Sequence, residues 1–245
     1  VGVLAFSAGL GTTLMNNGLP WFAAVLVIIM FGVFIGFING WMVAKLKAAA
    51  LIETLAMGLI LQGALMALTQ GRSIINFPEA YSWIGQGTIG ALPVLPIPFL
   101  LVYLIIYIVW KKTVFGRSLF ATGGNTKSAY VSGINVDRIK ILAFTISGGL
   151  AGFAGYLLSA YMGAVTMTFG SDLLMYTLAA AVIGGVSLMG GRGNISGVLG
   201  GVLLLTVIQT GLQILGISSY YVTMVGGLMI FIAVVVDALK TKYLQ

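Results

Sequence analysis

Long apolar segments separated by short polar ones make up most of this chain of 245 residues. A short apolar segment, residues 1–15, comes first, and the longer ones cover residues 21–43, 48–69, 94–110, 139–161, 173–189, 195–215 and 221–238. Apolar helices of about 18 residues or more can cross a hydrocarbon core of roughly 30 Å, whereas barrel strands would alternate apolar and polar positions. The pattern predicts an all-α fold, a polytopic bundle of transmembrane helices with about eight spans, the first of them partial.

The positive charges predict how these spans are oriented. If the spans alternate in direction, all of the 12 Lys and Arg residues except Arg72 lie in loops or tails on one side. The positive-inside rule makes that side the cytoplasm. The C-terminus and the polar segment 111–140 are therefore both expected in the cytoplasm, and Arg72 in an outer loop, residues 70–93.

The composition excludes several classes of function. Hydrophobic residues make up 60% of the chain and charged residues 7%, and there is no Cys and no His. Disulfides, imidazole bases and most metal clusters are thereby excluded, so we expect no metal, no cofactor and no catalytic residues. A membrane enzyme would need a convergent nucleophile and base, which scattered acidic residues do not supply. The net charge of +7 follows from topology, so no nucleic-acid binding is expected.

The most polar stretch, GGNTKSAYVSGINVDRIK at residues 123–140, interrupts the apolar pattern. Asn125 is expected to cap a short helix, residues 126–132, and Gly133 to end it in a left-handed conformation. Such a helix is either a solvated basic element that fixes topology or a docking element for a partner. Its residues alone favour the first interpretation.

Glycines are abundant, but their spacing is that of helix packing. Gly148, Gly152 and Gly155 share a helix face, and Gly197 with Gly201 repeats the spacing of small residues that bring helices close together. The run GGRGN at residues 190–194 resembles a nucleotide loop, but no GxxxxGK[ST] motif exists in the chain. We interpret this run as a tight turn between two spans.

Polar residues inside the apolar segments are candidates for a solute pathway. The clearest stripe repeats at i, i+3, i+4 and i+7 and consists of Thr206, Gln209, Thr210 and Gln213. Such a face either lines a pathway or forms hydrogen bonds between helices, and both interpretations stay open. Gln62 and Asn39 are weaker pathway candidates. Glu53, in the first turns of a helix, is interpreted as a residue stabilised by the helix dipole.

Three stretches in the second half of the chain carry a family resemblance. They are GRSLFATGGNTKSAYVSGINVDRIK from Gly116, then LAAAVIGGVSLMGGRGNISGVLGG, and then LQILGISSYY. In this order they resemble the membrane permeases of the ribose-type ABC sugar importers, in the branched-chain amino acid/ribose permease superfamily. The similarity is close over residues 116–245 and looser before them.

The resemblance implies a fold and a set of partners. Such permeases are subunits of about ten helices, so residues 1–245 are expected to form a single transmembrane domain that lacks two N-terminal helices. The implied partners are a cytoplasmic ATP-binding subunit, a second permease in a homo- or heterodimer, an extracytoplasmic solute-binding protein and membrane lipid. The implied location is the bacterial inner membrane.

The resemblance also assigns a role to the polar segment. It implies a coupling helix that docks on the ATP-binding subunit through Asn125, Lys127, Ser128, Ala129, Ser132 and Gly133. The small residues Ser128 and Ala129 would fit into a groove, and motion would pass through Arg138 and Ile139 into the next span.

The predicted function is the membrane permease of an ATP-driven ABC importer for a small polar solute, with a monosaccharide favoured. Residues 174–177 depart from the acidic pattern of many sugar permeases, so a nucleoside, a branched-chain amino acid or a furanose signalling molecule stays an alternative. An ion-coupled secondary transporter is the other alternative, although no predicted span carries a carboxylate at its centre.

Overall fold

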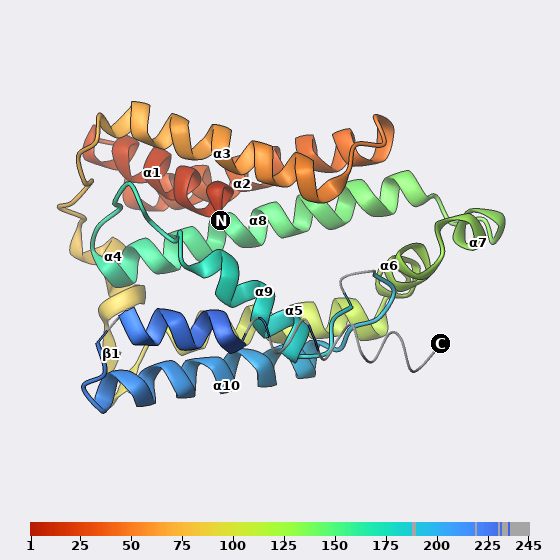
Figure 1. Ribbon diagram of the computed structural model, residues 1–245. Coiled ribbons are helices and arrows are strands. Elements are labelled where there is room, and N and C mark those ends of the chain that lie inside the picture. The colour runs from red at the N-terminus through yellow and green to blue at the C-terminus, as the bar shows by residue number, and fades with distance from the viewer. Residues whose placement is uncertain (188–189, 219, 230, 232–234, 236–245) are drawn as a thin grey trace. The chain divides into compact units, whose positions relative to one another are not determined.

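The computed structural model describes residues 1–187, 190–218, 220–229, 231 and 235. Helices dominate these residues (Figure 1). Their bounds are α1 Gly2–Asn16, α2 Trp21–Lys45, α3 Ala50–Thr69, α4 Glu79–Gln86, α5 Pro96–Lys112, α6 Val114–Gly124, α7 Thr126–Val131, α8 Val136–Met162, α9 Leu173–Ile183 and α10 Ile195–Ile214. A small hairpin of β1 (Thr88–Ile89) and β2 (Leu92–Pro93) lies between α4 and α5 in the chain.

The predicted all-α membrane fold is confirmed, but the predicted number of spans is not. In the described residues four helices are long and apolar enough to cross a membrane, namely α2, α3, α8 and α10, or up to five if α5 and α6 form one bent span. The first segment is a helix of only 15 residues. The segment predicted at residues 173–189 is helical only to Ile183, because Gly185 adopts a left-handed φ of +85°. The last predicted span, residues 221–238, falls partly outside the described residues.

The chain divides into two compact units, each described here by itself. The first consists of residues 1–116 and 133–171 and contains α1 to α5 and α8. Its helices α2 and α8 lie side by side, with α1 and α3 beside them and α4 against one end of α8 (Figure 1). A buried apolar cluster, which includes Ile28, Tyr81, Tyr156 and Ala160, joins α2, α4 and α8.

The short helix α4 is attached firmly to α8. The hydroxyl groups of Tyr81 and Ser159 share a buried hydrogen bond of 2.6 Å, and Tyr81 packs edge-on against Tyr156. A Cβ atom at Gly85 would lie 2.3 Å from the backbone of Ala160, so only glycine allows this approach. Burial raises the pKa of the Tyr81 phenol, which therefore stays neutral as a hydrogen-bonding group.

Glycines also bring α2 and α8 into backbone contact, as their spacing predicts. A Cβ atom on Gly32 would lie 2.4 Å from the carbonyl oxygen of Gly148, and one on Gly36 would lie 2.4 Å from that of Phe144. Further along, a Cβ atom on Gly152 would lie 2.7 Å from the carbonyl oxygen of Ile28. We call this line of contacts between α2 and α8 the glycine seam.

The second unit consists of residues 117–132 and 172–245, of which the described part contains most of α6, then α7, α9 and α10. Helices α9 and α10 pack together as Gly197 and Gly201 predict, because Cβ atoms there would lie 2.1 Å and 2.2 Å from the carbonyl oxygens of Gly184 and Ala180. Gly190 and Gly191, both with positive φ, begin the turn that the sequence predicts at residues 190–194.

Candidate functional site

The predicted coupling segment forms the short helix α7 with the expected signals at both ends. Asn125 has an extended backbone, and its side-chain oxygen accepts a hydrogen bond of 2.9 Å from the backbone nitrogen of Ser128. At the other end, Ser132 continues the hydrogen bonding to the Ser128 carbonyl, and Gly133 turns the chain with a φ of +81°. The N-cap and the left-handed glycine that the sequence predicts are therefore confirmed.

Five of the six residues predicted to dock on a partner are exposed in α7 or at its ends, and one is buried. Ala129, predicted to fit into a partner's groove, is only 3% exposed and is thus covered within the chain. Asn125, Lys127, Ser128, Ser132 and Gly133 are exposed.

The sequence reasoning missed two apolar side chains of α7, Tyr130 and Val131, which are 75% and 86% exposed. The signal that could have found them is the contrast between two large apolar residues and the polar segment around them. The surface of α7 therefore carries two large apolar side chains next to exposed polar residues, Lys127 among them.

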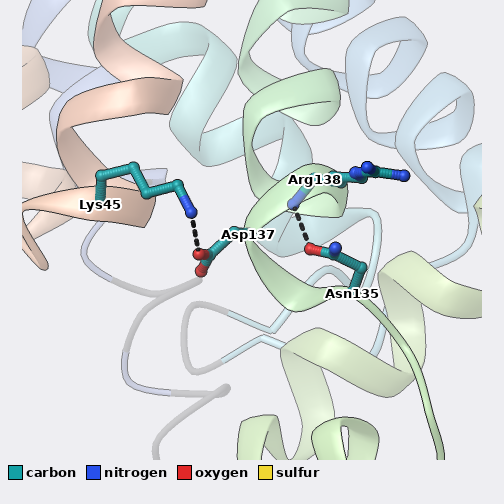
Figure 2. A network of polar contacts seen from close by, with 4 residues as sticks. All are labelled: Lys45, Asn135, Asp137 and Arg138. Carbon is teal, nitrogen blue, oxygen red and sulfur yellow. Dashed lines mark hydrogen bonds and ion pairs between the residues drawn. The ribbon is translucent and has the colours of Figure 1, made fainter.

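Helix α8 begins a few residues after α7, and its first turn is fixed by several polar contacts. The side-chain oxygen of Asn135 accepts a hydrogen bond of 3.1 Å from the backbone nitrogen of Arg138. The Nζ atom of Lys45, at the end of α2, lies 2.7 Å from Oδ2 of Asp137 (Figure 2). Figure 2 also shows the Arg138 side chain pointing away from this pair. The sequence analysis did not predict the ion pair.

The predicted polar stripe lies on α10. Thr206, Thr210 and Gln213 are exposed, and Gln209 is half-buried. The Thr206 hydroxyl donates a hydrogen bond of 2.8 Å to the Val202 carbonyl in the same helix. The stripe is therefore open on the surface of the described chain.

The two weaker pathway candidates have different surroundings. Gln62 is exposed on α3. Asn39 is buried, and when its side-chain amide is turned so that the nitrogen faces these acceptors, it donates to the Ile35 carbonyl at 3.3 Å and to Oε1 of Glu53 at 3.0 Å. Asn39 thus joins α2 to α3 through the buried Glu53, an arrangement that favours a helix-pairing role. Among the described residues, no group of three or more His, Cys, Asp or Glu side chains could hold a metal ion.

Residues 1–234 match the family described as branched-chain amino acid transport system / permease component. The chain belongs to this family. It is 36% identical over 241 residues to the ribose import permease protein RbsC of Bacillus subtilis (strain 168), a match that covers 98% of this chain and 75% of the relative. It is 35% identical to RbsC of Escherichia coli (strain K12), covering 97% of this chain and 75% of the relative.

A further relative is the galactose/methyl galactoside import permease protein MglC of Haemophilus influenzae, 34% identical over 91% of this chain and 68% of the relative. No solved structure matches the chain significantly. These relatives confirm the resemblance to sugar importer permeases that the sequence motifs carry.

Family membership makes the chain a multi-pass permease of an ABC importer and not an enzyme. A permease of an ABC importer implies an ATP-binding subunit and a solute-binding protein, as the sequence analysis expects. The alternative of an ion-coupled secondary transporter is not favoured.

Proposed function

We propose that this chain forms the solute pathway of a bacterial monosaccharide importer, as one of two permeases in the inner membrane. The names of its relatives, which are import permeases for ribose and for galactose, support a monosaccharide solute. The distribution of Lys and Arg supports an orientation with α7 and the C-terminus in the cytoplasm. Residues 1–245 would then act as one transmembrane domain.

The proposal includes docking of α7 on the ATP-binding subunit. The observation that carries it is the exposure of Tyr130 and Val131 on a short capped helix that is not among the candidate spans. Large apolar side chains at the surface of a spanning helix can face lipid, but beside a water-facing segment they favour burial against a partner. The caps at Asn125 and Gly133 keep the helix formed without the partner, which reduces the conformational entropy lost on docking.

The polar stripe on α10 is proposed as part of the pathway. Exposed amide and hydroxyl groups on an apolar spanning helix are unfavourable against lipid, so the stripe should face the solute or the second permease. Neutral hydrogen-bonding groups suit a sugar, because they bind its hydroxyls without holding it tightly. Gln62 and Asn39 stay weaker candidates, and the contact of Asn39 with Glu53 argues against it.

The test is Val131→Glu in the full-length permease, expressed with its ATP-binding and solute-binding proteins. A carboxylate on the proposed docking face should reduce both recovery of the ATP-binding subunit with the permease and uptake of radiolabelled ribose by at least about tenfold, since an unpaired buried charge costs several kcal/mol. The matched control is Val114→Glu, the same change at a valine 69% exposed and outside α7.

Two results would count against docking through α7. One is normal uptake and normal recovery of the ATP-binding subunit with Val131→Glu. The other is an equal loss with Val114→Glu, because the effect would then not be specific to α7. Membrane protein levels and thermal unfolding show whether each variant folds. Ala129→Glu is a poorer test, because Ala129 is already covered within the chain.

A further inference from the structure

The first turn of α8 is the first helical turn of the first unit that follows α7 in the chain. Only residues 132–135 connect the end of α7 to the start of α8. A Cβ atom added to Gly133 would meet nothing within 4 Å, so the space beside this glycine is open. From Asn135 onward the chain is fixed by its N-cap bond to Arg138 and by the Lys45–Asp137 ion pair (Figure 2).

The ion pair lies at the end of the glycine seam. Its nearest seam contact is at Gly40, where a Cβ atom would lie 2.9 Å from Cα of Ile141, one turn after Asp137. The seam continues through Gly36 and Gly32 to the contact between Gly152 and Ile28. Because these are contacts of backbone with backbone, α2 and α8 cannot slide past each other without clashes.

The exposure of the ion pair limits what it can do. The side chains of Lys45 and Asp137 are 53% and 43% exposed, and such pairs add little to stability. The glycine seam therefore holds the two helices together, while the pair fixes how the end of α2 faces the first turn of α8. Asp137 at the start of one helix and Lys45 at the end of the other also suit the helix dipoles, which favours this geometry.

We propose that Lys45 and Asp137 are positioning residues that join the end of α2 to the first turn of α8, so that displacement of α7 moves both helices together. This inference rests on the proposed docking of α7. Without the ion pair, the first turn of α8 could rotate while the end of α2 keeps its position. ATP is then hydrolysed with less solute moved.

The experiment uses the whole importer in liposomes and measures ribose transported per ATP hydrolysed. We expect Lys45→Gln and Asp137→Asn each to lower this ratio about two- to fivefold. Thermal unfolding should stay unchanged, because an exposed ion pair adds little to stability. The double variant should be no worse than either single one, because both remove the same interaction. Lys45→Arg should keep the wild-type ratio, since arginine can still pair with Asp137.

Lys112→Gln is the matched control, because it also removes an exposed positive charge at the end of a helix, here α5. The proposal is overturned if both single variants keep the wild-type ratio, if their effects add in the double variant, or if Lys112→Gln lowers the ratio as much. A failure of docking is distinguishable, because Val131→Glu would then leave the ATP-binding subunit attached. If Val131→Glu releases that subunit but Asp137→Asn couples normally, only the positioning role is wrong.

Discussion

The glycine seam gives a prediction whose size can be worked out from distances. In Gly148→Ala, the new methyl group would lie 2.2 Å from the carbonyl oxygen of Gly32 and 2.7 Å from Cα of Gly36. Ordinary contact begins at 3.4 Å, so the helices must separate locally by 1.2 Å, the difference between 3.4 and 2.2 Å. Both opposing atoms belong to backbone, so no side-chain rotation relieves the clash.

Two opposing terms set the expected effect. Overpacking at such a contact costs about 2–3 kcal/mol. Alanine is favoured over glycine within a helix by about 1 kcal/mol, which offsets part of that cost. The net loss of about 1–2 kcal/mol corresponds to a fall of about 2–8 °C in the unfolding temperature of a domain of this size.

The assay is thermal unfolding of the purified protein in a mild detergent, followed by tryptophan fluorescence. The matched control is Gly63→Ala on α3, where a Cβ atom meets nothing within 4 Å. In this variant only the helix-propensity term acts, so the unfolding temperature should stay level or rise by about 2–4 °C. If Gly148→Ala were as stable as Gly63→Ala, the backbones of α2 and α8 would not be in contact.

Two further predictions concern the predicted site residues. Gly133→Ala should lower ribose uptake more than Gly133→Asn, because a left-handed φ of +81° costs an alanine about 1–2 kcal/mol and asparagine less; equal effects would show that this conformation is not required. Since the chain has no Cys, Gln209→Cys can be labelled alone, and ribose should slow its reaction with a water-soluble thiol reagent. Val207→Cys, at a residue 70% exposed on another face of α10, should stay unreactive; equal labelling of both would contradict the pathway proposal.

Features that depend on neighbours in the chain could be predicted from the sequence. Asn125 caps α7 and Gly133 ends it, because capping and left-handed turns are decided by the residues within one helical turn. The sequence also predicted the glycine faces of α8 and α10, because the helix period fixes which residues share a face. The family motifs after Gly116 could also be recognised from the sequence, because each of them is a continuous run of residues.

Only the tertiary structure decided which residues meet and which stay exposed. Lys45 and Asp137 are 92 positions apart, and the burial of Ala129 beside the exposed Val131 depends on segments that local patterns do not place. The contact of Asn39 with Glu53 likewise depends on how α2 packs against α3, which the sequence does not show. Hydropathy also did not show that the helix within residues 173–189 ends at Ile183, because it records how apolar a segment is but not whether a glycine with positive φ ends its helix.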